Sequence, residues 1–260
     1  MTSTDLIYLA WNRLEFTRFS FEMLLANTDW DLVREIHVYD DGSTDGTREW
    51  MRERLNRNDG MIPPNIIFHE TELGSPVAVM NDYIAGTDSD RFAKIDNDIV
   101  VPPGWLEDLT GTMDANPEVD VLGMEAGRMG VPYRDGVEWD GVYTVEPARW
   151  IGGVGLIRTR ALGERPRMNS NGRFGWTEFQ REYSLNIGWI KPDLALTELS
   201  RIPFEPWRSL SDEYRKIELN DWKRPDELER DWPRYHEHWC EFYWSWWPPD
   251  HAKYAEGDQA

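Results

Sequence analysis

The chain has 260 residues, a formal net charge of −20 at pH 7 and a sequence pI near 4.6, and such an acidic surface repels nucleic acid and anionic membranes. Its single cysteine, Cys240, excludes an internal disulfide. Residues 1–5 lack the features of a signal peptide and no stretch approaches the roughly 18 apolar residues of a membrane span, so we expect a cytoplasmic protein.

The first half of the chain alternates short apolar runs with segments of helical spacing. Strands are predicted at residues 6–10, 36–39, 66–68, 92–95 and 119–124. Helices are predicted at residues 14–26, from a cap at Thr44 or Asp45 to about Leu55, from Pro76 onward, and at 105–113. This alternation predicts an α/β fold with a mainly parallel sheet covered by helices.

The second half is less regular. Residues 136–145 are expected to form a short hairpin or meander, and residues 150–157 are glycine-rich and then strand-like. Residues 173–178 lead into a predicted helix that ends near Gly188. After Pro203 the composition changes, since seven of the fifteen tryptophans lie between Trp207 and Trp247.

An acidic cluster follows the second predicted strand. Gly42 and Gly46 permit tight turns, and a carboxylate of Asp40 or Asp41 placed there can accept a hydrogen bond from a nucleobase N–H. A plain strand-to-helix turn with a cap would use the same residue types. An EF-hand loop is excluded, because Arg52 stands where the bidentate glutamate belongs.

A second acidic cluster follows the fourth predicted strand. Asp96 and Asp98 are two residues apart, so in extended chain their carboxylates point the same way and suit a hard cation such as Mg²⁺ or Mn²⁺. An isolated Asp-x-Asp is common on surface turns. Ligands of α/β sheets bind at the carboxyl ends of strands, however, and the place of this cluster in the strand series favours a site for a metal and a phosphate-bearing ligand.

These segments, taken in order, resemble the GT-A glycosyltransferases of the family 2 type. The residues that carry the resemblance are 10–13, 38–47, 74–81, 96–98, 152–158 and 176–178, within roughly residues 5–195. The resemblance implies a GT-A, Rossmann-like nucleotide-diphospho-sugar transferase domain at 1–200. It comprises a donor-binding half at 1–125 and an acceptor-side half at 126–200, and an aromatic-rich extension follows at 201–260.

The resemblance also implies a metal-dependent transfer of sugar from a nucleoside-diphosphate sugar, with UDP as the expected nucleotide and Mn²⁺ or Mg²⁺ as the ion. The resemblance implies that Asp98 chiefly, and Asp96 beside it, bind the metal, with His236 and His238 as candidate further ligands. The implied donor-binding residues are Ala10, Asn12, Arg13, Asp40, Asp41, Asn81, Lys94, Asp96, Asn97 and Asp98.

Glu178 is the candidate catalytic base for an inverting transfer, because one carboxylate must take the proton of the acceptor hydroxyl. The family usually writes Glu-Asp after an aromatic residue, and here Thr177 and Glu178 follow Trp176, so Glu178 aligns with the Asp. The alternative is an ordinary glutamate in the first turn of a helix, stabilised by the helix dipole.

Other interpretations stay open for several residues. His236 and His238 suit packing as well as metal binding, Asn81 suits a helix surface, and Lys94 suits plain solvation. The tryptophans of the extension suit a sugar-stacking platform, a subunit contact that would make a homo-oligomer, or a membrane edge.

Two other functions compete with sugar transfer. A sugar nucleotidyltransferase would carry a glycine-rich basic loop near the first strand, and residues 11–15 offer none. A non-catalytic sugar-binding module would keep the fold without needing intact acidic clusters. The acceptor of a transferase is open among glycan, protein, lipid and small molecule.

Overall fold

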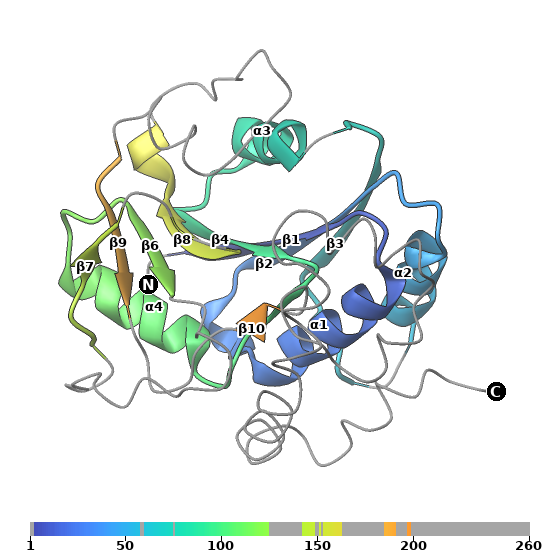
Figure 1. Ribbon diagram of the computed structural model, residues 1–260, viewed down its shortest axis with the longest axis horizontal. Helices are drawn as coiled ribbons and strands as arrows, with labels where there is room; N and C mark the ends of the chain where they lie inside the picture. Colours follow the sequence, from blue (N-terminus) through green and yellow to red (C-terminus); the bar gives the residue numbers. More distant parts are fainter. Residues whose placement is uncertain are drawn as a thin grey trace, which may run out of the picture.

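The computed structural model describes residues 3–57, 60–74, 76–124, 142–148, 151, 153–162, 185–190 and 197–198. These residues form a sheet with helices on both faces (Figure 1). The elements, in chain order, are β1 (Thr4–Ala10), α1 (Leu14–Asn27), the 3₁₀ helix η1 (Trp30–Leu32), β2 (Glu35–Asp41), α2 (Thr47–Leu55), β3 (Ile66–Thr71), α3 (Pro76–Gly86), β4 (Arg91–Asp96), β5 (Ile99–Val100), α4 (Trp105–Ala115), β6 (Val121–Met124), β7 (Glu146–Pro147), β8 (Val154–Arg158), the 3₁₀ helix η2 (Thr159–Leu162), β9 (Ile187–Ile190) and β10 (Thr197–Glu198).

The main sheet has eight strands in the order β3-β2-β1-β4-β8-β6-β9-β7. Strands β3, β2, β1 and β4 run parallel to one another, as predicted. Strand β8 runs antiparallel between β4 and β6, and β9 returns parallel to β6. The sheet is therefore mixed but mostly parallel. A separate pair joins β5 to β10 in antiparallel register.

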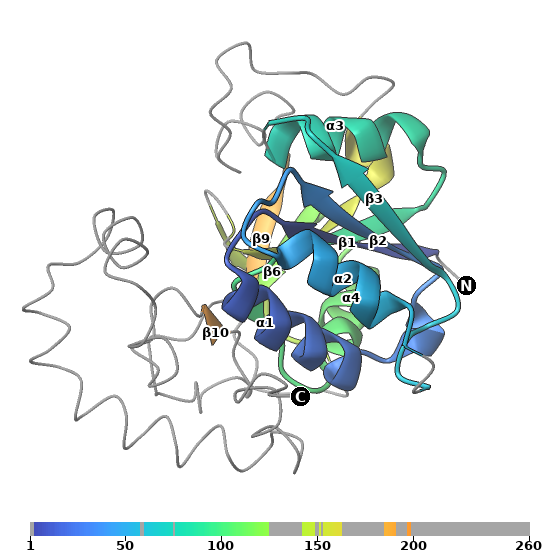
Figure 2. The same ribbon diagram turned by 90° about the vertical axis from the view of Figure 1, so that its right-hand side faces the viewer.

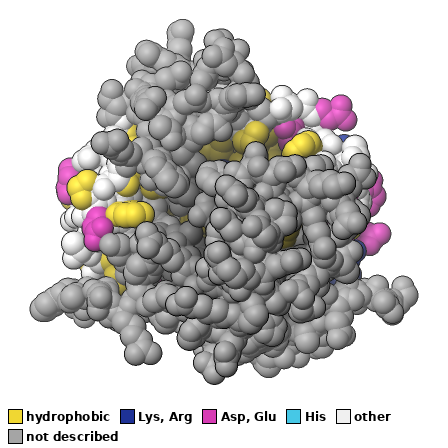
Figure 3. Space-filling view, in the orientation of Figure 1, with side chains coloured by type: hydrophobic (Ala, Val, Ile, Leu, Met, Phe, Trp, Pro, Cys, Tyr) yellow, Lys and Arg dark blue, Asp and Glu magenta, His cyan; other side chains and the backbone are white. Residues whose placement is uncertain are grey.

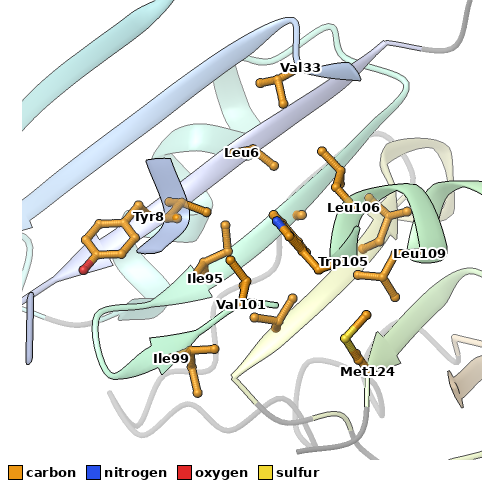
Figure 4. Close-up of a cluster of buried hydrophobic side chains, with 14 of the residues drawn as sticks. Leu6, Tyr8, Val33, Ile95, Ile99, Val101, Trp105, Leu106, Leu109 and Met124 are labelled. Carbon is orange, nitrogen blue, oxygen red and sulfur yellow. The ribbon is translucent and has the colours of Figure 1, made fainter. Parts of the chain in front are cut away.

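Helix α3 covers one face of the sheet, and α1, α2 and α4 cover the other (Figures 1 and 2). Leu6 and Tyr8 of β1 are buried on the face of α1, whereas Ile7 is buried on the face of α3. This two-sided burial explains why residues 6–10 of β1 are a continuous apolar run. Figure 4 shows Trp105 at the centre of the larger cluster, where α4 packs against β1 and β4.

The segment around Gly188 differs from its sequence-based prediction. The prediction of a helix that continues to about Gly188 is wrong at its C-terminal end, because Ile187–Ile190 forms strand β9 between β6 and β7. A run of four residues carries too little periodicity to distinguish strand from helix, and the pairing with β6 decides. The two-residue strands β5, β7 and β10 also lie outside the predicted strands.

The described part of the chain leaves the C-terminal segment untested. The proposed division into 1–125, 126–200 and 201–260 stays a prediction. No helix among the described residues is long and apolar enough to cross a membrane. Acidic side chains lie around the rim of the described surface in Figure 3, in keeping with the net charge of −20.

Candidate functional site

The carboxyl ends of three parallel strands bring the predicted residues together at one edge of the sheet. Ala10 of β1 lies in register with Asp40 of β2, and Leu9 lies in register with Asp96 of β4. The two acidic clusters are thus neighbours on either side of β1. This is the edge at which open α/β sheets bind ligands.

The turn between β1 and α1 is held in an unusual conformation. Asn12 and Arg13 have φ of 53° and 63°, in the left-handed region that non-glycine residues rarely adopt. The Asn12 N–H donates to Ser43 Oγ at 2.7 Å, and its Oδ1 accepts from the Thr44 N–H at 2.8 Å. Asn97 Nδ2 donates to the Asn12 carbonyl at 2.9 Å. The turn is thereby tied to both acidic clusters.

Asp40 is fully buried, and its two carboxylate oxygens differ. Oδ1 accepts from Arg48 Nε at 2.7 Å and from the Ser43 N–H at 3.1 Å. Oδ2 is buried and has no hydrogen-bond partner among the described residues. Arg48 also donates to the Thr71 carbonyl at 3.0 Å, which fixes the guanidinium between β2 and β3. A buried acceptor without a donor is rare, and Oδ2 is the oxygen of Asp40 that has capacity for a further hydrogen bond.

Asp41 has a different environment from Asp40. Its Oδ1 accepts from Thr71 Oγ1 at 3.1 Å and from the Leu73 N–H at 2.5 Å. These bonds anchor the end of β3 and the residues after it. Asp41 therefore shapes the loop, whereas Asp40 keeps an acceptor without a partner among the described residues.

The carboxylates of Asp96 and Asp98 each face a cation of the chain. Asp98 Oδ2 accepts from Arg13 Nη1 at 3.0 Å, and Asp96 forms an ion pair with Lys94 Nζ. The Asp98 side chain is 14% exposed and that of Asp96 is 34% exposed. Burial and then the charge of Asp96 raise the pKa of Asp98 above its ordinary value, although Arg13 and Lys94 act to lower it.

Asn97 points away from the carboxylates on either side of it. Besides its bond to Asn12, its Nδ2 donates to Thr17 Oγ1 at 2.8 Å. Its backbone carbonyl accepts from Ser20 Oγ at 2.7 Å, and Ser20 is hydrogen-bonded to Tyr8. These contacts fix the turn that carries Asp96 and Asp98. A donor-binding role for the Asn97 side chain stays a prediction.

The other predicted residues occupy varied positions. Lys94 is 8% exposed on β4, and Ala10 is almost fully buried at the end of β1. Asn81 lies on α3, and its Nδ2 is buried without a hydrogen-bond partner among the described residues. Glu178, His236 and His238 lie outside the residues that the structure describes.

The glycine-rich segment before β8 has a steric reason beside the acidic pair. A Cβ on Gly153 would lie 2.4 Å from Ile99 Cγ1 and 3.5 Å from Asp96 Oδ2. Only glycine leaves room there for the strand that follows the acidic turn. Tight packing against Ile99 therefore accounts for the glycine at position 153.

Two residues at this edge of the sheet, Trp11 and Arg48, are not among the site residues predicted from the sequence. Trp11 is 64% exposed between Ala10 and Asn12, where its ring is open to a ligand. A tryptophan at a turn position was the available signal. Arg48 stands in the first turn of α2, where the helix dipole disfavours a cation. A basic residue at that position indicates a nearby carboxylate, which is Asp40.

A second acidic group lies at the opposite, amino end of the strands. Ligand atoms of Asp5, Glu35 and His37 lie within 4.8 Å of one another. Both Asp5 oxygens accept from Arg34, at 2.9 and 2.8 Å, and Tyr83 donates to Asp5 at 2.7 Å. Asp5 is fully buried and both of its carboxylate oxygens already accept hydrogen bonds, so this group fits a metal poorly. The hard, partly exposed oxygens of the Asp96 and Asp98 carboxylates fit Mg²⁺ or Mn²⁺ better.

Comparison with known proteins agrees with this geometry. Residues 5–161 match the family model described as glycosyl transferase family 2. The fold resembles residues 1–349 of S. aureus TarS, with a TM-score of 0.57 and 16% identity over 94% of this chain and 73% of that one. No curated protein sequence matches.

Two further solved structures carry ligands. The same TarS fragment in complex with UDP-GlcNAc has a TM-score of 0.54 and 16% identity, over 93% of this chain and 73% of that one. Mannosyltransferase PcManGT from Pyrobaculum calidifontis, in complex with GDP-Man and Mn²⁺, has a TM-score of 0.54 and 16% identity over 96% and 73%. At this identity the likeness concerns the fold, and the predicted fold class is confirmed.

Proposed function

Because this chain belongs to glycosyl transferase family 2, we propose that it moves a sugar from a nucleoside-diphosphate sugar to an acceptor hydroxyl, with the help of a divalent cation. The meeting of both acidic clusters at the carboxyl edge of β1, β2 and β4 carries this proposal. The fold neighbours in complex with UDP-GlcNAc and with GDP-Man and Mn²⁺ support the choice of donor and ion.

The acidic pair is the proposed diphosphate end of the site. Asp98 chiefly, and Asp96 beside it, would hold Mg²⁺ or Mn²⁺ through carboxylate oxygens. When bound there, the ion supplies positive charge against the diphosphate that leaves. Lys94 and Arg13 add two cations at the same edge, which makes it attractive to phosphate although the whole chain is strongly acidic.

Asp40 is the proposed base reader, since its Oδ2 is the buried acceptor without a described partner. A carboxylate accepts an N–H and gives none, so it selects uracil through N3–H or guanine through its N1–H and amino group. Cytosine lacks that ring N–H. The exposed face of Trp11 suits stacking on the same base. UDP is the expected nucleotide, and GDP is the competing one.

The sugar end of the reaction rests on Glu178 as the proposed base. A single displacement forms the bond from the acceptor oxygen to the anomeric carbon, breaks the bond to the diphosphate oxygen, and passes the hydroxyl proton to the carboxylate. Attack opposite to the leaving group inverts the anomeric centre. His236 and His238 stay candidate metal ligands, and the aromatic extension stays a candidate acceptor or subunit surface.

A panel of nucleotide-sugars, screened by thermal shift with and without Mn²⁺ and then by turnover, tests the proposal. We expect a UDP-sugar or a GDP-sugar to raise the melting temperature only with Mn²⁺, and Asp98→Asn to lose both the shift and the turnover. Equal turnover by wild type and Asp98→Asn would remove the metal from the reaction. A shift with free sugar that needs neither nucleotide nor metal would instead indicate a sugar-binding module.

A further inference from the structure

The strained turn after β1 points one side chain at the acidic pair. Asn12 and Arg13 are the non-glycine residues with positive φ in the part of the chain that the structure describes. A glycine would adopt this conformation without strain and would serve equally well as a connection. Backbone strain that is kept in place by surrounding hydrogen bonds, as Asn12 is here, is typical of functional sites. The side chain placed by this turn is that of Arg13.

Arg13 occupies the carboxylate that a cation would need. Its Nη1 donates to Asp98 Oδ2 at 3.0 Å, and its guanidinium lies 5.9 Å from the centre of the Phe16 ring. A carboxylate oxygen that accepts from a guanidinium must give up or share that bond when it binds a metal ion. The Asp98 side chain is only 14% exposed, so few water molecules can replace a hydrogen bond that its carboxylate loses.

We propose that Arg13 exchanges partners when the metal ion and the donor bind. It pairs with Asp98 in the ligand-free protein, and it turns to the diphosphate of the donor once a divalent cation takes Asp98. The inference rests on the proposed function, since it needs a diphosphate and a metal at this edge. A guanidinium suits both partners, because its fork of N–H groups matches carboxylate and phosphate oxygens alike.

Lys94 is not expected to move in the same way. Its side chain is 8% exposed on the central strand β4, whereas Arg13 is 31% exposed on a turn. Lys94 therefore stays beside Asp96 as a fixed charge. Of the two cations at the acidic pair, Arg13 is the one with room to change partner.

The exchange couples the two ligands. A metal ion that binds alone must weaken the pair of Arg13 and Asp98, and a nucleoside diphosphate that binds alone meets a guanidinium already in use. When both are bound, the metal ion takes the place of Arg13 at Asp98, and the diphosphate takes the place of Asp98 at Arg13. Each should therefore tighten the binding of the other by the same factor.

Two titrations of the full chain test the exchange. Binding of Mn²⁺ alone is measured by electron paramagnetic resonance, and binding of UDP at saturating Mn²⁺ is measured by calorimetry. Arg13→Gln should bind Mn²⁺ alone more tightly than the wild type and should bind UDP about tenfold more weakly, from the loss of one charge-assisted hydrogen bond. Arg18→Gln makes the same charge change on α1, where Arg18 lies over the Trp50 ring, and should leave both affinities unchanged.

A magnetic-resonance measurement separates partner exchange from a general effect of charge. The Nε–Hε signal of Arg13 is identified as the one missing from Arg13→Gln. It should shift when Mg²⁺ and UDP are added together to the wild type. A signal that stays in place, or Mn²⁺ and UDP affinities of Arg13→Gln equal to those of the wild type, would overturn the exchange.

Asp98→Asn tells this failure apart from failure of the proposed function. If Asp98→Asn loses Mn²⁺ binding while Arg13→Gln behaves as wild type, the metal site stands and only the exchange is wrong. If Asp98→Asn binds Mn²⁺ and UDP as the wild type does, the metal lies elsewhere and both proposals fall.

Discussion

Replacement of Arg48 by methionine would measure how much the ion pair of Arg48 and Asp40 contributes to the stability of the fold. In the wild type the fully buried Asp40 carboxylate accepts from Arg48 Nε at 2.7 Å, and Arg48 also donates to the Thr71 carbonyl at 3.0 Å. Arg48→Met keeps most of the side-chain volume but removes these bonds and the longer one from Arg48 to the Asp40 carbonyl, at 3.5 Å. The carboxylate would then retain only the Ser43 N–H as a described donor.

The expected cost follows from the burial of the two partners. Removal of one partner of a buried ion pair costs about 3–5 kcal/mol, because it leaves a buried charge uncompensated. The Arg48 side chain is 18% exposed, so water replaces part of what is lost, and we expect about 2–3 kcal/mol. For a chain of this size that corresponds to a fall of about 5–10 °C in melting temperature.

Urea and thermal unfolding of Arg48→Met measure this cost, with Arg52→Met as the matched control. Arg52 lies on the same helix and pairs with Glu70, but their side chains are 47% and 34% exposed, so the control should unfold close to the wild type. The double variant with Asp40→Asn should recover part of the loss, because the buried charge is gone. Equal stability of Arg48→Met and Arg52→Met would refute the reasoning about Asp40.

Three further outcomes can be measured. Gly153→Ala places a Cβ 2.4 Å from Ile99 and should lower the unfolding free energy, measured in urea, by about 1–3 kcal/mol. The control Gly86→Ala has open space around the new Cβ and should unfold close to the wild type. Similar stabilities of the two variants would argue against the close approach of Gly153 to Ile99. Burial, and then the charge of His37, lower the pKa of His69. The stability linked to His69 is therefore present above pH 6.5, the ordinary histidine pKa, and is lost as the pH falls. His69→Gln should flatten the dependence of the unfolding free energy on pH below that value. An unchanged slope would contradict this reasoning. Trp11→Ala should leave the melting temperature unchanged, because the ring is 64% exposed, yet weaken UDP binding by about 1–3 kcal/mol, and unaltered binding would exclude stacking.

Much of the fold follows from local patterns in the first half of the chain. The apolar runs of β1, β2 and β4 and the helical spacing of α1 and α4 are long enough to predict their type. The edge at which both acidic clusters meet then follows from parallel strand order. Strand β9 did not follow, because its four residues are stabilised by pairing with β6, which lies more than sixty residues earlier.

The division of labour within the site could not be read from the sequence. Asp40 and Asp41 are chemically identical neighbours, but Arg48 of α2 pairs with Asp40, whereas Thr71 donates to Asp41. The pair of Arg13 and Asp98 joins residues 85 positions apart through a left-handed turn that carries no glycine. Such contacts depend on tertiary placement, for which a local motif gives no signal.

Anomalous diffraction at the manganese absorption edge, from crystals grown with UDP and Mn²⁺, tests the central claim most directly. The account predicts a manganese peak coordinated by Asp98 at the carboxyl edge of the sheet, with Arg13 turned from that carboxylate toward the diphosphate. A peak between Asp5, Glu35 and His37, or UDP bound with no manganese beside Asp98, would contradict it.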